Sequence, residues 1–176
     1  MKKALTLFAL LSFLFMNAQY NSGTIYFKDG KTKQGLIKKR NFAGIKFKEN
    51  KDSKIITYDF NHITGYDTNI GYYRYKKEYN SSHKLYELLT RGKITLYSLQ
   101  KSSSGFAIPG GGGATFGGGT STTYFIEKGE RFMKLGSKVR KGNLFYFTDC
   151  PLLIKKIKAK ELKGKNVYKI IDISKM

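Results

Sequence analysis

The stretch Phe147-Thr148-Asp149-Cys150-Pro151 holds the single cysteine of the chain and one of its two prolines. Short alternating segments with glycine turns precede it, as in β-strands, and apolar residues at helical spacing follow it. Thr148 or Asp149 can N-cap a helix that has Pro151 in its first turn, where a missing N–H costs nothing. We therefore predict a structural joint formed by Phe147, Asp149, Cys150 and Pro151, with Cys150 facing the sheet.

The sequence predicts two helices after the joint. Gly164 is expected to end the first, and Asn166 can cap the second. Their apolar stripes are Leu153, Ile154 and Ile157, then Val167, Ile170 and Ile171. A further helix is predicted from Ser137 toward Tyr146, although Gly142 weakens it by ~1 kcal/mol relative to alanine.

The segment before the joint has the two-residue period of antiparallel strands. Ile25 and Phe27 alternate with Tyr26 and Lys28, and Asp29-Gly30 then forms a turn. Strands are predicted over 23–28, 34–39, 44–48, 54–58, 63–66, 71–76, 84–90, 93–99, 124–128 and 131–135. Residues 85–89 also suit a helix, but the strand-like residues that follow favour a hairpin through Arg91-Gly92.

Strands first and helices last indicate the α+β class. We expect an antiparallel, curved or barrel-like β meander followed by C-terminal helices packed on it. One domain is predicted over 19–176, β-rich over 19–135 and helical over 137–176. Residues 101–123 are rich in glycine and serine, so this segment is expected to be a mobile loop between two strands.

The N-terminus has the pattern of a secretory signal peptide. Lys2 and Lys3 precede an apolar run over 4–16, and Asn17-Ala18-Gln19 supplies a small residue for cleavage after Ala18. The apolar run is shorter than the ~20 residues that span a bilayer as a helix. Residues 1–18 are therefore predicted to direct export to the periplasm or the medium, including the periphery of the outer membrane. No transmembrane segment is expected in the mature chain.

Positive charge is the compositional feature with functional weight. The chain has 33 lysines and arginines against 12 acids, a formal net charge of +21. Such a surface attracts polyanions and anionic lipid head groups. The clearest mixture of aromatic and cationic residues is Tyr73, Arg74, Tyr75, Lys76 and Lys77, which we predict to contact a polyanion. Outward lysines that only protect strand edges from aggregation are the alternative.

Several chemistries lack their motifs. The glycine run is not followed by Lys-Ser or Lys-Thr, as a P-loop requires, and the two histidines, His62 and His83, have no metal-ligand spacing. No Gly-x-Ser-x-Gly elbow occurs. A lone exported cysteine can be buried, paired between chains or reactive, and burial is the ordinary case. No cofactor and no metal are predicted.

Four short motifs resemble a loosely defined, uncharacterised group of secreted bacterial proteins. They are Asn17-Ala18-Gln19, Asp29-Gly30, the hairpin Gly92-Lys93-Ile94-Thr95-Leu96-Tyr97, and the Phe-x-Asp-Cys-Pro-x-Leu joint over 147–153 with its terminal helices. The resemblance implies export and an α+β domain, but no activity. The polyglycine segment departs from the group and has the character of an insertion.

These observations predict an exported, non-enzymatic protein that binds an envelope component or a protein partner through a basic surface. Anionic envelope polymers and lipid head groups are the expected ligands, whereas export makes nucleic acid an unsuitable one. Two alternatives remain: a structural accessory of an envelope complex that docks by its C-terminal helices, and an enzyme with an unrecognised site.

Overall fold

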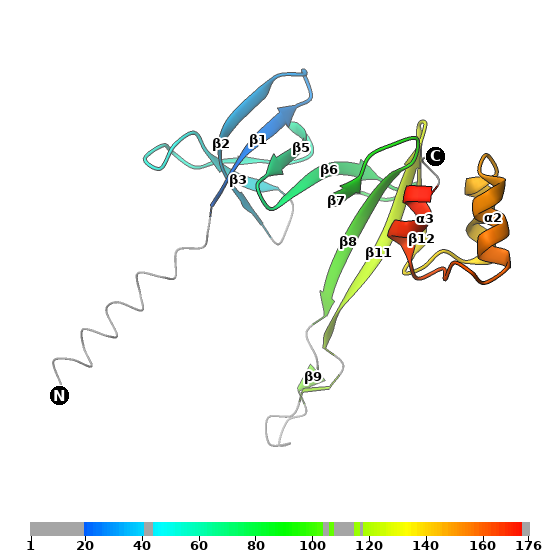
Figure 1. The fold of residues 1–176 in the computed structure, drawn as a ribbon. Coiled ribbons are helices and arrows are strands. Elements are labelled where there is room, and N and C mark those ends of the chain that lie inside the picture. The colour runs from blue at the N-terminus through cyan, green and yellow to red at the C-terminus, as the bar shows by residue number, and fades with distance from the viewer. Residues whose placement is uncertain (1–19, 41–43, 104–105, 108–114, 117, 174–176) are drawn as a thin grey trace, which may run out of the picture. The chain divides into compact units, whose positions relative to one another are not determined.

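The computed structural model of the chain describes residues 20–40, 44–103, 106–107, 115–116 and 118–173 (Figure 1). The chain divides into two compact units, which meet in sequence between Ile70 and Gly71. Each unit is described by itself below. The predicted signal peptide over 1–18 lies outside the described residues. The single domain over 19–176 stays a prediction.

The first unit contains five antiparallel strands. Their order in the sheet is β5-β1-β2-β3-β4. The bounds are β1 Asn21–Phe27, β2 Thr32–Lys39, β3 Ile45–Lys48, β4 Ile56–Tyr58 and β5 Ile63–Thr68. The predicted turn at Asp29-Gly30 is confirmed, because Gly30 has a φ of 83° and the Lys31 N–H donates to Asp29 Oδ1 at 3.0 Å. Ile25, Ile37 and Phe47 are buried, as the alternation requires.

The second unit has a five-stranded antiparallel sheet in the order β6-β7-β8-β11-β12. The bounds are β6 Gly71–Lys77, β7 His83–Thr90, β8 Thr95–Ser103, β11 Gly119–Lys128 and β12 Arg131–Gly136. Residues 85–89 lie in β7, so the strand interpretation is confirmed over the helical one. The strand order is open in both units.

The predicted loop over 101–123 is partly β-structure. Strand β8 continues to Ser103 and β11 begins at Gly119, and these two residues are partners in the register. A second small pair joins β9 Phe106–Ala107 to β10 Thr115–Phe116. Serine and threonine suit an extended hairpin arm, which composition alone does not distinguish from a loop. The rest of this predicted loop lies outside the described residues.

Helices follow the sheet, so the α+β class is confirmed. They are the 3-10 helix η1 Lys141–Phe147, α2 Pro151–Lys158 and α3 Val167–Ile173. Figure 1 shows α2 and α3, orange to red, beside the β8–β11–β12 part of the sheet. The predicted apolar stripes of the helices pack against one face of these strands and form a single hydrophobic core with it, which we call the helix-side core. Its buried residues are Ile94, Leu96, Ile126, Leu135, Val139, Leu144, Phe147, Leu153, Leu162, Val167, Ile170 and Ile171.

Three predicted helix ends were wrong. Cys150, not Thr148 or Asp149, is the N-cap of α2, because Thr148 is still in the αR conformation that closes η1. The helix ends at Lys158, before Gly164, because Lys160 adopts a positive φ of 63°. The helix expected from Ser137 begins only at Lys141.

Candidate functional site

The predicted polyanion-contact residues Tyr73–Lys77 lie in β6, and their side chains divide between the two faces of the sheet. Arg74 is paired with Tyr86 in the register, and Lys76 with Lys84. Side chains alternate along a strand, so Arg74 and Lys76 share the face of Tyr86. Tyr73, Tyr75 and Lys77 belong to the other face. The structure therefore brings two of the five predicted residues together.

The face that carries Arg74 has an aromatic floor. Tyr86, Tyr97 and Phe125 are buried there, and Phe132 packs against them. The Phe125 and Phe132 rings stack with centroids 5.4 Å apart, and Tyr86 meets Phe125 edge-on at 4.8 Å. Such aromatic pairs add about 0.5–1.5 kcal/mol each to the burial of the rings. The floor is thus a packed support for the polar groups around it.

Glu127 joins Lys76 to Tyr97 at this face. The Tyr97 hydroxyl donates to Glu127 Oε2 at 2.6 Å, and Lys76 Nζ donates to Glu127 Oε1. Lys76 Nζ also lies 5.7 Å from the centroid of the Tyr97 ring. Burial, and then the hydrogen bond to Glu127, raise the pKa of Tyr97, so this phenol is a hydrogen-bond donor at neutral pH and not a base.

A second carboxylate has the same role at the start of the hairpin that leads into β7. The Tyr86 hydroxyl donates to Glu78 Oε1 at 2.8 Å, and Lys84 Nζ donates to the same atom at 3.0 Å. Burial raises the pKa of Glu78, but the hydrogen bonds from Lys84 and Tyr86 outweigh it and leave this pKa below its ordinary value. Both buried phenols are therefore fixed by carboxylates that lysines neutralise.

A cleft of about 350 Å³ opens on this face of the second unit. We call it the basic cleft, and its lining consists of Arg74, Lys76, Leu88, Arg91, Gly92, Thr95 and Tyr97. Three of these residues are cationic, and Lys76 is paired with Glu127. Arg74 Nη1 donates to the Tyr73 carbonyl at 2.7 Å, which holds one side of its guanidinium. Arg74, Lys76 and Arg91 therefore give the lining of the cleft its cationic character.

Local strand geometry places Arg91. It lies in the β7–β8 turn, where the register shifts between Leu88 and Thr90. Such irregularities re-aim the side chains beside them. The positive charges of Arg74 and Arg91 both oppose the rise in the pKa of Tyr97, as cations close to its ring would. The turn therefore adds a second guanidinium to the cleft.

The chemistry of the basic cleft is that of anion recognition. A guanidinium presents several N–H donors in a plane that matches carboxylate, sulfate and phosphate groups. The volume of the basic cleft, about 350 Å³, is at the lower end of the range for small-ligand sites. Thr95 adds a hydroxyl, and the apolar side chain of Leu88 restricts water on one wall. These groups suit one anionic group together with the part of the molecule that carries it.

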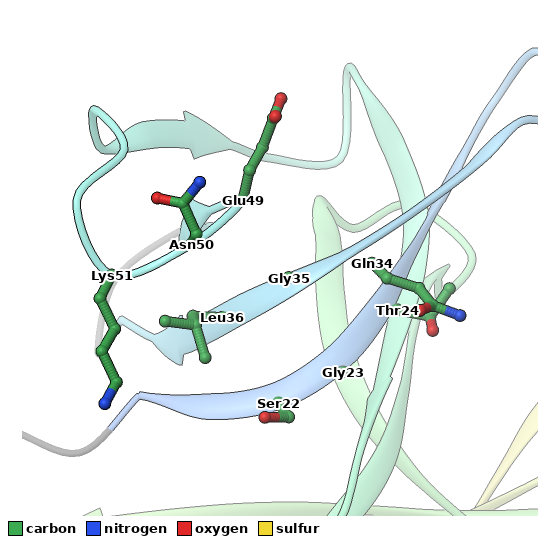
Figure 2. Close-up of a pocket in the computed structure, with 9 residues that line it drawn as sticks. All are labelled: Ser22, Gly23, Thr24, Gln34, Gly35, Leu36, Glu49, Asn50 and Lys51. Atoms are coloured by element: carbon green, nitrogen blue, oxygen red, sulfur yellow. The ribbon is translucent and has the colours of Figure 1, made fainter.

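Two other clefts are weaker candidates. Figure 2 shows the cleft of about 590 Å³ in the first unit, whose polar side chains point in different directions. Asn50 Oδ1 accepts from the Asp52 N–H and the Ser53 hydroxyl, and Glu49 is paired with Lys33. These groups maintain a turn and a strand pair. A cleft of about 660 Å³ in the second unit includes Asn143, whose Oδ1 accepts from the Arg140 N–H that begins η1.

The predicted joint has a structural role. Phe147 is fully buried, Cys150 is half-buried against the helix-side core, and Pro151 is the first residue of α2. Lys128, at the end of β11, donates to Asp149 Oδ1 at 2.7 Å and to the Tyr146 carbonyl at 3.0 Å. That hydrogen bond with Lys128 lowers the pKa of Asp149. The joint thus connects the sheet to the helices.

We also searched the part of the chain that the structure describes for clusters of metal ligands and for membrane-spanning helices. No group of three or more His, Cys, Asp or Glu residues gathers there as metal ligands would. His62 Nδ1 lies 2.8 Å from Asp59 Oδ1, within the turn before β5. None of the described helices is long and apolar enough to cross a membrane.

Comparisons of the chain with family models, with curated proteins and with solved structures found no match. The basic cleft therefore has to be interpreted from its own residues. Sequence reasoning identified Arg74 and Lys76 but missed Arg91, Thr95, Tyr97 and Glu127. The alternation of β6 and the position of Arg91 in a hairpin turn were the available signals.

Proposed function

We propose that the protein is an exported, non-enzymatic binding protein of the cell envelope, of the secreted bacterial group that its motifs resemble. Its basic cleft binds an acidic group of an envelope polymer, and the export signal places it in the periplasm or outside the cell. We also propose that the β meander is curved or barrel-like, because a curved sheet would enclose the aromatic side chains on its concave face more closely.

One observation carries the proposal: two guanidinium groups, those of Arg74 and Arg91, line the same small cleft. Glu127 supports this cleft by binding both Lys76 and Tyr97. Positive charge built on a rigid strand pair favours a specific anion site over general attraction by surface lysines.

The ligand class follows from the donors. Guanidinium groups at the mouth of a small cleft suit the sulfate, phosphate or carboxylate of an acidic polysaccharide or a teichoic-type polymer, bound one repeating unit at a time. Nucleic acid would meet an exported protein rarely. The many exposed lysines then act at longer range, by increasing the rate of encounter with a polyanion.

Calorimetric titration with a heparin-derived tetrasaccharide tests this proposal, with uncharged maltotetraose as the ligand control. Hydrogen bonds to charged groups contribute about 1.5–3 kcal/mol, so Arg74→Gln and Arg91→Gln should each weaken binding roughly 10- to 100-fold at 0.15 M salt. Arg131→Gln is the matched control, because Arg131 is exposed at the start of β12 and outside the cleft.

Equal losses for all three variants would contradict the proposal, because they would show attraction by total charge alone. Failure of the wild-type chain to bind the tetrasaccharide at low salt would also contradict it. Circular dichroism of each variant should match the wild type, since none of the three substitutions removes a side chain from the core.

A further inference from the structure

The helical segment after the sheet exposes large apolar side chains. Phe145 in η1 is 62% exposed and Leu152 in the first turn of α2 is 59% exposed. Neighbouring residues of the same helices, Leu144 and Leu153, are buried in the helix-side core. Phe145 and Leu152 are therefore not part of the helix-side core, although they belong to helices that pack on it. The two helices, η1 and α2, are in contact with each other.

Cations flank this exposed pair in the sequence. They are Arg140 and Lys141 at the start of η1, and Lys155, Lys156, Lys158 and Lys160 in or directly after α2. The acids between residues 137 and 165 are Asp149 and Glu161, and Lys128 binds the first of them. Lys155 and Lys156 follow Leu152 by three and four residues, so they lie one helical turn away on its side of α2.

This mixture distinguishes a membrane surface from a protein partner. Lysine is depleted in the cores of protein interfaces, which are contiguous and apolar. Segments that lie in a lipid interface instead combine isolated Phe and Leu side chains with lysines, because the apolar groups enter the acyl boundary while the cations meet the head groups. The segment around Phe145 and Leu152 has the second composition.

We propose that this segment, which we call the η1–α2 surface, docks onto anionic lipid bilayers by inserting Phe145 and Leu152 between the head groups. It lies on the helix side of the sheet, whereas the basic cleft is on the opposite face, so the proposal goes beyond the proposed function. Charge and insertion act together, since one weak signal gives only marginal membrane binding.

The chain contains no tryptophan, which permits a site-specific test. Phe145→Trp and Leu152→Trp each introduce a single fluorescent reporter at an exposed position. Tyr79→Trp is the matched control, because Tyr79 is 94% exposed in a turn of the same unit. Each variant of the predicted mature chain, residues 19–176, is mixed with vesicles of phosphatidylglycerol and phosphatidylcholine, and separately with vesicles of phosphatidylcholine alone. A reporter at a fixed position excludes signal from any other apolar segment.

The expected result is a blue shift at positions 145 and 152 with anionic vesicles, together with quenching by brominated acyl chains. No shift is expected with neutral vesicles or at position 79. An equal shift at all three positions, or no shift at 145 and 152, would overturn the proposal. A shift with polyglutamate as large as that with vesicles would overturn it too, in favour of an acidic protein surface.

The lysines supply a second readout in the Phe145→Trp background. Each basic residue near an anionic surface contributes roughly a fivefold gain in binding, so replacing Lys155, Lys156 and Lys158 by glutamine should weaken vesicle binding on the order of 100-fold. Lys28→Gln, Lys38→Gln and Lys46→Gln together remove the same charge from the first unit. An equal loss in both triple variants would refute a localised surface.

Discussion

The joint offers a sharp test because two phenylalanines two residues apart have opposite environments. Phe147 is fully buried in the helix-side core, whereas Phe145 is 62% exposed. Both belong to η1, so Phe147→Ala and Phe145→Ala remove the same atoms from the same helix. The difference between them isolates burial from any effect of helix propensity.

The expected magnitudes follow from burial. Removing a fully buried phenylalanine ring costs about 3–5 kcal/mol, because both the transfer free energy and packing contacts are lost. An exposed substitution away from partners changes stability by about 0.5 kcal/mol or less. A unit of roughly a hundred residues has a free energy of unfolding of about 5–15 kcal/mol, so Phe147→Ala removes a large part of it.

Urea denaturation followed by far-ultraviolet circular dichroism measures the difference. With an m-value of about 2 kcal/mol/M, Phe147→Ala should lower the midpoint of the second unit by about 1.5–2.5 M and Phe145→Ala by at most about 0.3 M. Equal shifts for the two variants would refute the burial of Phe147. So would a Phe147→Ala chain with the wild-type midpoint, because the joint would then carry no packing.

Three further predictions concern stability and export. Gly164→Ala should destabilise the second unit by more than about 1 kcal/mol in urea, because an added Cβ would lie 2.1 Å from the Val139 carbonyl oxygen. Gly142→Ala is the control and should be neutral or stabilising, because a Cβ at that position would meet open space. Equal effects of the two substitutions would contradict this prediction. Because the folded pKa of Glu78 is lowered, the stabilising effect of its carboxylate is present above the ordinary carboxyl range and is lost as pH falls through the folded pKa. The unfolding free energies of wild type and Glu78→Gln should therefore differ at pH 7 and converge as the pH is lowered through the acid range, and a constant difference would count against this. Cell fractionation followed by N-terminal sequencing should find a mature chain that starts at Gln19, and an intact Met1 in an exported fraction would disprove the cleavage.

Local patterns predicted the strands well. Ile94 and Leu96 are two residues apart and both are buried in the helix-side core, as the two-residue period of a strand predicts. Asp29-Gly30 forms the predicted turn, in which Gly30 has a positive φ. The helical stripe of Val167, Ile170 and Ile171 was also visible, because burial repeats along one face. These features depend on residues close together in sequence.

Helix ends and the basic cleft depend on residues far apart. Lys160 adopts a left-handed conformation that lysine does not favour by itself, so no local pattern indicates that α2 ends before Gly164. Glu127 reaches Lys76 across strands that are 51 residues apart in sequence. Strand order and register decide such contacts, and a single sequence does not encode them in a local pattern.

We expect the basic cleft to recognise an acidic group, in contrast to a general attraction by the positively charged surface. Amide chemical-shift mapping of the ¹⁵N-labelled chain during titration with the heparin-derived tetrasaccharide tests it most directly. Saturable shifts should concentrate at Arg74, Arg91, Thr95 and Tyr97 and disappear in Arg91→Gln. Shifts spread evenly over lysine-bearing strands of both units, unchanged by Arg91→Gln, would contradict it.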